Sequence, residues 1–183
     1  ILETTKKDIK IRVESLHSNH VMQPHLIFLL PLLKKEALEE AVYSLCEIGV
    51  NEIQLVATAK SKALSAVTSK ELDRLRAIII AAAEQSKNYT LSTLLEPKKL
   101  QDVISSFSQA SQKIVFDVSG KSFFQIHKTT EKNIILSVGP EGGFTNEELT
   151  FLQSHGFESC ALTHTTLRAV QAVAISSGLF RLL

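Results

Sequence analysis

The sequence is poor in the residues that usually mark disulfide-rich, metal-binding or membrane proteins. Its two cysteines, Cys46 and Cys160, lie far apart and form no C-x-x-C pair, which excludes a disulfide framework and a thiolate metal site. The six histidines are scattered without metal-ligand spacing, so we expect no metal. Apolar runs such as residues 77–83 fall far short of the ~20 residues that a bilayer span needs, and no apolar block of a secretory signal opens the chain. We therefore expect a cytoplasmic protein without membrane contact.

An excess of one charge is also missing, because 20 Lys and Arg residues face 19 Asp and Glu residues. Domains that bind nucleic acid through phosphate contacts usually show a marked basic excess, so composition gives no indication of an RNA partner. Apolar residues, in contrast, make up 44% of the 183 residues, enough for one substantial core and at most a small appendage. We expect residues 21–183 to form the main domain. Residues 1–20, a β-prone piece followed by a polar linker, are expected to be a linker or the remnant of another domain.

Short apolar runs rich in β-branched residues predict strands that are covered on both faces. They lie at residues 26–30, 53–57, 114–118, 134–138 and 159–162. Segments with helical spacing alternate with these strands, and the alternation predicts an α/β fold with a parallel sheet flanked by helices.

The ends of several helices are marked in the sequence. The first helix ends at Gly49, and capping-box patterns open helices at Thr68 and Thr145. Weaker patterns predict a helix over about residues 97–108 and a short helix or loop over 121–130. The last helix, about residues 167–183, is apolar around much of its circumference, which predicts packing against a second subunit as well as its own sheet.

The glycine-rich loop G-P-E-G-G-F at residues 139–144 is the first candidate site. It lies between the strand at 134–138 and the helix that opens at Thr145, and open α/β sheets bind ligands at the carboxyl ends of their strands. A tight turn without a ligand explains the loop equally well. No G-K-[ST] ending or G-x-G-x-x-G pattern is present, which argues against a nucleotide P-loop or a dinucleotide site. The acidic residue and the backbone groups instead suit a cationic ligand such as a methyl-donor sulfonium.

A second loop, residues 162–168, follows the last strand and leads into the final helix. It therefore belongs at the same edge of the sheet, where the two loops could form one pocket. Arg168 opens an otherwise apolar helix, which is unusual because arginine avoids burial unless it is paired or contacts an anion. A snorkelling or ion-paired arginine is the structural alternative.

With both loops in view, the chain resembles the RsmE-type 16S rRNA uracil N-3 methyltransferases of the trefoil-knotted SPOUT superfamily. The G-P-E-G-G-F loop followed by Thr145 and Glu148 matches the family pattern G-P-E-G-G-F-[ST]-x-x-E. Residues 47–50, 58–61 and 82–86 resemble its E-L-G-V, T-E-R-S and A-A-E-Q-S segments, and Leu167-Arg168 falls at its I-L-R. The resemblance covers about residues 25–183.

The resemblance implies a C-terminal trefoil knot, a homodimer and S-adenosylmethionine as cofactor. It also implies an N-terminal PUA-like β-barrel RNA-binding domain, of which residues 1–20 would be the remnant. The cofactor-binding residues carried over from the family are Leu30, Pro31, Val138, Gly139, Pro140, Gly142, Gly143, Leu162, Thr166, Leu167 and Ala169. The sequence departs from the family pattern at Leu32-Leu33, Thr163 and Ala169-Val170.

The implied reaction methylates N-3 of a uridine base in 16S ribosomal RNA of the small subunit. The N–H proton leaves as the methyl group arrives, so donors near the carbonyl oxygens of the base would stabilise the developing negative charge. We assign that role to Arg168, with Glu141 shaping the loop or facing the cationic donor. Three alternatives stay open: another SPOUT methyltransferase acting on tRNA or rRNA, a catalytically silent RNA-binding homologue, and a phosphate-binding module.

Overall fold

The computed structural model describes residues 1–107, 112–125 and 133–182. Its centre is a six-stranded sheet in the order β5-β4-β3-β7-β6-β8, and every neighbouring pair is parallel. The strands are β3 (His25–Pro31), β4 (Glu52–Ala57), β5 (Thr93–Lys99), β6 (Gln112–Ser122), β7 (Asn133–Val138) and β8 (Phe157–Ala161). The predicted parallel sheet flanked by helices is confirmed. The trefoil knot is consistent with this topology and stays a prediction.

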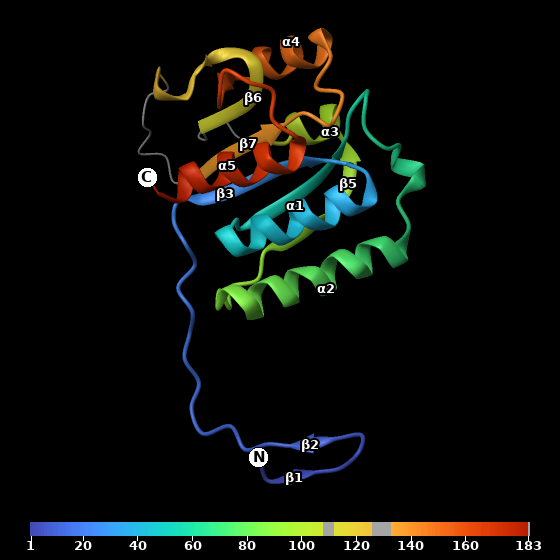
Figure 1. The fold of residues 1–183 in the computed structure, drawn as a ribbon, viewed down its shortest axis with the longest axis vertical. Coiled ribbons are helices and arrows are strands. Elements are labelled where there is room, and N and C mark those ends of the chain that lie inside the picture. Colours follow the sequence, from blue (N-terminus) through green and yellow to red (C-terminus); the bar gives the residue numbers. More distant parts are fainter. Residues whose placement is uncertain (108–111, 126–132, 183) are drawn as a thin grey trace.

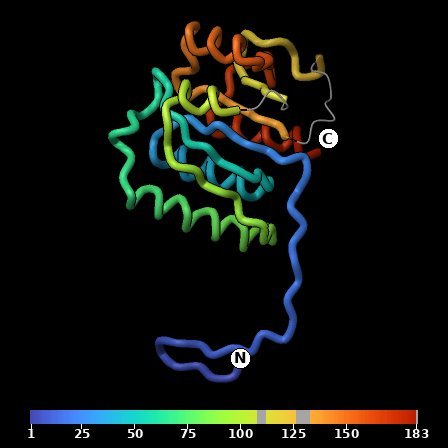
Figure 2. The backbone as a smooth tube through the Cα atoms, turned by 180° about the vertical axis from the view of Figure 1, so that it is seen from behind, coloured from blue at the N-terminus to red at the C-terminus, as the bar shows by residue number. Residues whose placement is uncertain are grey.

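The α-helices of the described residues, α1 to α5, cover the two faces of the sheet (Figures 1 and 2). On one face, α1 (Lys35–Ile48), α2 (Ser69–Ser86) and α5 (Ala169–Arg181) enclose the larger apolar cluster, which includes Phe28, Leu55 and Phe180. On the other face, α3 (Leu100–Ile104) and α4 (Asn146–Ser154) enclose a smaller cluster. Short 3-10 turns, η1 (Leu64–Ala66) and η2 (Phe123–Gln125), complete these connections. Because both faces are covered, the strands can be apolar almost throughout.

Two of the predicted helix ends are confirmed in full. Gly49 ends α1 in the left-handed conformation, with φ of 84°. Thr145 opens α4 with a complete capping box. At α2 the prediction holds in part: Thr68 accepts a hydrogen bond from the Glu71 backbone, but the Glu71 carboxylate pairs with Lys62 at 2.8 Å. Lys62 thus competes with the N-terminus of α2 for the Glu71 carboxylate.

The predicted helix over residues 97–108 is partly wrong. Residues 97–99 belong to β5, and among the described residues of this range, which end at 107, only Leu100–Ile104 are α-helical. β5 is an edge strand, where proline is tolerated. The register shifts between Gln54 and Val56, opposite the Glu96-Pro97 step. The buried Gln54 side chain donates to the Glu96 carbonyl at 2.8 Å and so fills the irregularity. In the other weak region, residues 121–122 extend β6 and η2 follows, while residues 126–130 lie outside the described ranges.

β6 and β8 approach each other unusually closely at Gly120. Their pairing shifts register between Phe116 and Lys121, and a Cβ at Gly120 would lie 2.4 Å from the Cys160 backbone nitrogen. No side chain fits at this position while the two backbones stay in contact.

The N-terminal segment runs away from this body (Figures 1 and 2). It contains a small hairpin of β1 (Glu3–Thr4) and β2 (Ile9–Lys10). Residues 1–22 are all exposed. Within the described ranges, no helix has the length and apolarity that crossing a bilayer requires.

Candidate functional site

The glycine loop follows β7, near the centre of the sheet, and is closed by its own backbone. The Gly143 amide donates to the Pro140 carbonyl at 2.8 Å. A Cβ at Gly139 would lie 3.0 Å from both Gly143 Cα and Phe144 N, so the turn has little room for a side chain there. Gly143 has φ of 67°, and a Cβ on it would meet no atom within 4 Å. The loop therefore presents its backbone to open space, as a ligand site requires.

The capping box of α4 also ties this loop to the loop after β4. Glu148 is only 5% exposed, and its carboxylate accepts from the Thr145 amide at 2.9 Å and from the Ala59 amide at 2.7 Å. Lys60, from the same loop as Ala59, donates from Nζ to the Gly142 carbonyl at 2.9 Å. Loops that are more than 80 residues apart in sequence thus hold one another in place.

Lys60 and Glu148 are site residues that the sequence reading did not assign. Both occur in motifs that it quoted, but the contact between them is long-range. Glu141, which it did assign, is exposed and accepts from the Lys34 backbone amide at 3.2 Å. Its carboxylate thereby links the glycine loop to the end of β3, which agrees with a role in shaping the loop.

The second loop, residues 162–168, lies at the same carboxyl edge as the glycine loop. β6 separates β7 from β8, so the two loops start about 10 Å apart, or two strand spacings. Thr163 Oγ1 donates to the Thr165 carbonyl at 2.6 Å and folds the loop on itself. Thr166 is exposed, and Leu162 and Leu167 are half-buried.

Arg168 directly precedes α5 and is exposed. It forms no ion pair with a described carboxylate, which argues against the ion-paired alternative, while an exposed head group is compatible with snorkelling. Its Nε donates to Gln171 Oε1 at 2.8 Å. Among the described residues, its two terminal nitrogens have no hydrogen-bond partner. Gln171 thus fixes one side of the guanidinium and leaves four N–H groups available to an incoming acceptor.

The remaining predicted cofactor residues lie beneath these loops. Leu30, Pro31, Pro140 and Val138 are buried at the ends of β3 and β7, and Ala169 is buried at the start of α5. Leu30, Val138 and Ala169 belong to one apolar cluster. The structure therefore gathers every predicted cofactor residue at one edge of the sheet.

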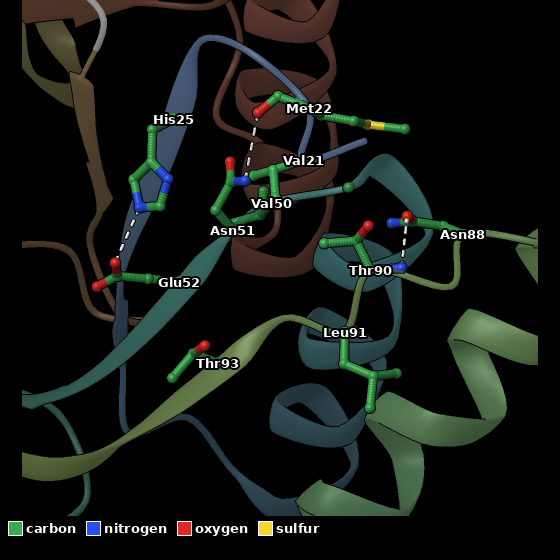
Figure 3. A pocket seen from close by; sticks show the side chains of 11 residues that line it. Val21, Met22, His25, Val50, Asn51, Glu52, Asn88, Thr90, Leu91 and Thr93 are labelled. Carbon is green, nitrogen blue, oxygen red and sulfur yellow. Dashed lines mark hydrogen bonds and ion pairs between the residues drawn. The ribbon is translucent and has the colours of Figure 1, made fainter. Parts of the chain in front are cut away.

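A separate hollow lies at the opposite, amino edge of the sheet (Figure 3). It is lined by residues that include Met22, Asn88 and Thr93. At its side, His25 Nε2 lies 2.8 Å from Glu52 Oε1. The two predicted loops do not contribute to this hollow, so it is distinct from the candidate site.

The chemistry of the two thiols and of possible metal ligands is limited by burial and spacing. Burial raises the pKa of the Cys46 and Cys160 thiols to about 11, so neither is an activated nucleophile. Within the described ranges, no group of three His, Cys, Asp or Glu side chains is placed to hold a metal ion.

The chain is thus an α/β domain with an all-parallel sheet. Its glycine loop and the arginine that precedes α5 lie at the carboxyl edge, where α/β enzymes of this architecture bind their ligands. Residues 21–181 match the family model of the RNA methyltransferase domain. The chain belongs to this RNA methyltransferase family, and the predicted RsmE-type resemblance is confirmed.

The sequence relatives include two proteins named ribosomal RNA small subunit methyltransferase E. The protein of Mesomycoplasma hyopneumoniae is 28% identical over 161 residues, covering 87% of this chain and 70% of the relative. That of Aquifex aeolicus is 27% identical over 143 residues, covering 75% of this chain and 59% of the relative. The chain thus corresponds to only part of these proteins.

Solved structures share the fold. The ribosomal RNA small subunit methyltransferase E of Neisseria gonorrhoeae, bound to S-adenosyl methionine, superimposes with a TM-score of 0.80 at 22% identity, covering 86% of this chain and 65% of that one. A putative methyltransferase of Legionella pneumophila with bound cofactor gives a TM-score of 0.80 at 22% identity, covering 87% and 67%.

Proposed function

We propose that this chain is the cofactor-binding part of a methyltransferase that transfers a methyl group from S-adenosylmethionine to N-3 of a uracil base in 16S ribosomal RNA, in the cytoplasm. The observation that carries the proposal is the G-P-E-G-G-F loop, held at the carboxyl edge by Lys60 and Glu148 in a chain that belongs to an RNA methyltransferase family. The names of the relatives support the choice of ribosomal RNA.

The residues at this edge suit S-adenosylmethionine. The space beside Gly143 is open, and Thr58 Oγ1, at the end of β4, is buried without a hydrogen-bond partner among the described residues. Buried polar atoms normally have a partner, so a ligand with polar edges would satisfy this one. When bound, the cofactor supplies an electrophilic methyl group on a sulfonium centre. The residues that would hold it are Leu30, Pro31, Val138, Gly139, Pro140, Gly142, Gly143, Leu162, Thr166, Leu167 and Ala169.

Arg168 is assigned to the acceptor base. As the N-3 proton leaves and the methyl group arrives, negative charge that builds on the uracil carbonyl oxygens is stabilised by N–H donors. The unpartnered terminal nitrogens of Arg168 are such donors, and the Nε contact to Gln171 orients them. Glu141 holds the loop through the Lys34 amide.

We also propose that two copies of the chain form a homodimer. Ile175 on α5 is 41% exposed, Val118 on β6 is 63% exposed and Phe124 in η2 is 94% exposed. Val118 and Phe124 belong to β6 and the turn that follows it, whereas Ile175 lies on α5, which packs on α1, β7 and β3. A second subunit would cover these side chains. Residues 1–20, whose hairpin is exposed on all sides, are proposed to be the remnant of an RNA-binding domain.

Calorimetric titration with S-adenosylmethionine and S-adenosylhomocysteine tests the cofactor site. Transfer of a labelled methyl group to deproteinised 16S rRNA and to isolated small subunits, followed by nucleoside digestion, tests the product. Saturable binding and formation of 3-methyluridine support the proposal. A methylated ribose or another base would overturn the acceptor assignment, and a folded chain that fails to bind either ligand would favour the silent homologue.

A further inference from the structure

Unpaired cations are concentrated along the carboxyl edge of the sheet, on the side of the glycine loop that faces β5. Lys34 and Lys35 follow β3, Lys60 follows β4, and Lys98 and Lys99 end β5. All five are exposed. In the described part of the chain, none of them lies within 4.0 Å of a carboxylate.

Several cations elsewhere on the body are engaged by the protein itself. Lys62, Arg74 and Arg76 each pair with a carboxylate. Lys113 and Arg181 donate to backbone carbonyls. At the carboxyl edge, Lys60 likewise donates to the Gly142 and Phe144 carbonyls, whereas the side chains of Lys34, Lys35, Lys98 and Lys99 have no such partner among the described residues.

Exposed carboxylates also share this edge, but the fold places each beside positive charge. Glu36, Asp102 and Glu147 lie in the first turns of α1, α3 and α4, where exposed backbone amides favour negative charge. Glu147 also interacts with Lys60, and Glu141 accepts from the Lys34 amide. The ammonium groups of Lys34, Lys35, Lys98 and Lys99 form no ion pair with these carboxylates.

The spacing of the strands fits an extended polyanion. β7 and β5 are three strand spacings apart, or about 14 Å. That distance corresponds to about four nucleotides at the rise of about 3.4 Å per nucleotide of a stacked strand. Lys98 and Lys99 are in register with Val56 and Ala57, next to the loop that carries Lys60, so the row of lysines is continuous.

We propose that this row is a track for the RNA backbone, along which the strand leaves the methylation site toward β5, with Lys98 and Lys99 as its distal phosphate contacts. The inference rests on the RNA methyltransferase function proposed above. It adds the direction in which the RNA strand runs across the surface of the domain. The opposite direction is less suited to a polyanion, because Val118 on β6 and Phe124 in η2 are exposed there.

The test is the salt dependence of RNA binding by the whole chain, with a fluorescent oligouridylate and with deproteinised 16S rRNA as probes. Each phosphate contact to a single strand contributes about 0.7 to the slope of log K against log salt. Lys98→Ala and Lys99→Ala should each lower the slope by about that amount, and the double variant by about 1.4. The double variant should bind about tenfold more weakly near 0.15 M salt and equal the wild type near 1 M.

Lys87→Gly is the matched control, since it removes one exposed charge at the C-terminal end of α2, away from the row of lysines. Lys87 already has a φ of 58°, which glycine adopts without strain. Its slope should equal that of the wild type, and thermal unfolding should show all variants folded. The track would be overturned by a double variant that keeps the wild-type slope, or by a control variant whose slope falls as much as that of Lys98→Ala. S-adenosylmethionine binding and methyl transfer by the wild type, measured in parallel, show separately whether the proposed function holds.

Discussion

The carboxylate of Glu148 is predicted to be the main link between stability and cofactor binding in this domain. It is 5% exposed and accepts from two backbone amides, those of Thr145 and Ala59. A hydrogen bond to a charged group contributes about 1.5 kcal/mol or more. Glu148→Ala removes both and should lower the free energy of unfolding by about 3 kcal/mol.

Thr145→Ala is the matched control, because it removes the other half of the same capping box. The Thr145 hydroxyl accepts from the Glu148 amide and also hydrogen-bonds with Glu147, and the loss of such a cap costs about 1 kcal/mol. Both bonds to the Glu148 carboxylate, from the Thr145 and Ala59 amides, remain possible in this variant. The extra loss in Glu148→Ala therefore includes the contact between the loop after β4 and α4.

Urea unfolding followed by circular dichroism measures both variants, and calorimetry measures their affinity for S-adenosylmethionine. We expect Glu148→Ala to weaken cofactor binding more than Thr145→Ala does, because only the former frees the loop that carries Lys60. Thermal midpoints should fall by about 6–12 °C and about 2–4 °C respectively. Equal losses in stability and in affinity for the two variants would refute the reasoning.

Three further predictions concern the loop, the arginine and the thiols. Gly139→Ala places a Cβ 3.0 Å from two backbone atoms and should weaken cofactor binding severalfold in calorimetry; unchanged affinity would show that the loop opens without loss. Arg168→Ala should lower kcat by about 100-fold with little change in cofactor affinity, and Arg168→Lys should restore part of the rate; equal losses of rate and affinity would indicate a structural role. Because burial raises the pKa of Cys46 and Cys160 from 9.0 to about 11, the folded state retains thiol protons that the unfolded chain loses, so stability should fall as pH rises from about 9 to 11. Urea unfolding of Cys46→Ala over the same pH range should show a smaller fall, and an identical fall would argue against the assignment to Cys46.

The local features of the site could be predicted from the sequence. The glycine loop, the Thr145 capping box and the position of Arg168 each depend on residues within a few positions of one another. The strand that precedes each loop is a short apolar run, so the placement of both loops at one sheet edge followed from the parallel topology.

Other features depend on contacts between distant segments and could not be predicted. β5 was missed because Pro97 and its neighbouring lysines resemble a loop or a helix start; the strand forms because β4 offers an edge and Gln54 fills the irregularity. Lys60 finds its carbonyl partner 82 residues away. Glu71 is a local case, since Lys62, nine residues earlier, pairs with the carboxylate that the predicted capping box would use.

At Gly120, β6 and β8 approach so closely that only the hydrogen of a glycine fits between their backbones. Real Cβ atoms essentially never come within 3.0 Å of another atom, and here one would lie at 2.4 Å, so even a methyl group would push β8 away from β6. The strand displaced in this way leads directly into the loop that ends at Arg168. The position of the loop that carries Arg168 thus depends on the absence of a side chain at Gly120, a residue outside the predicted cofactor contacts.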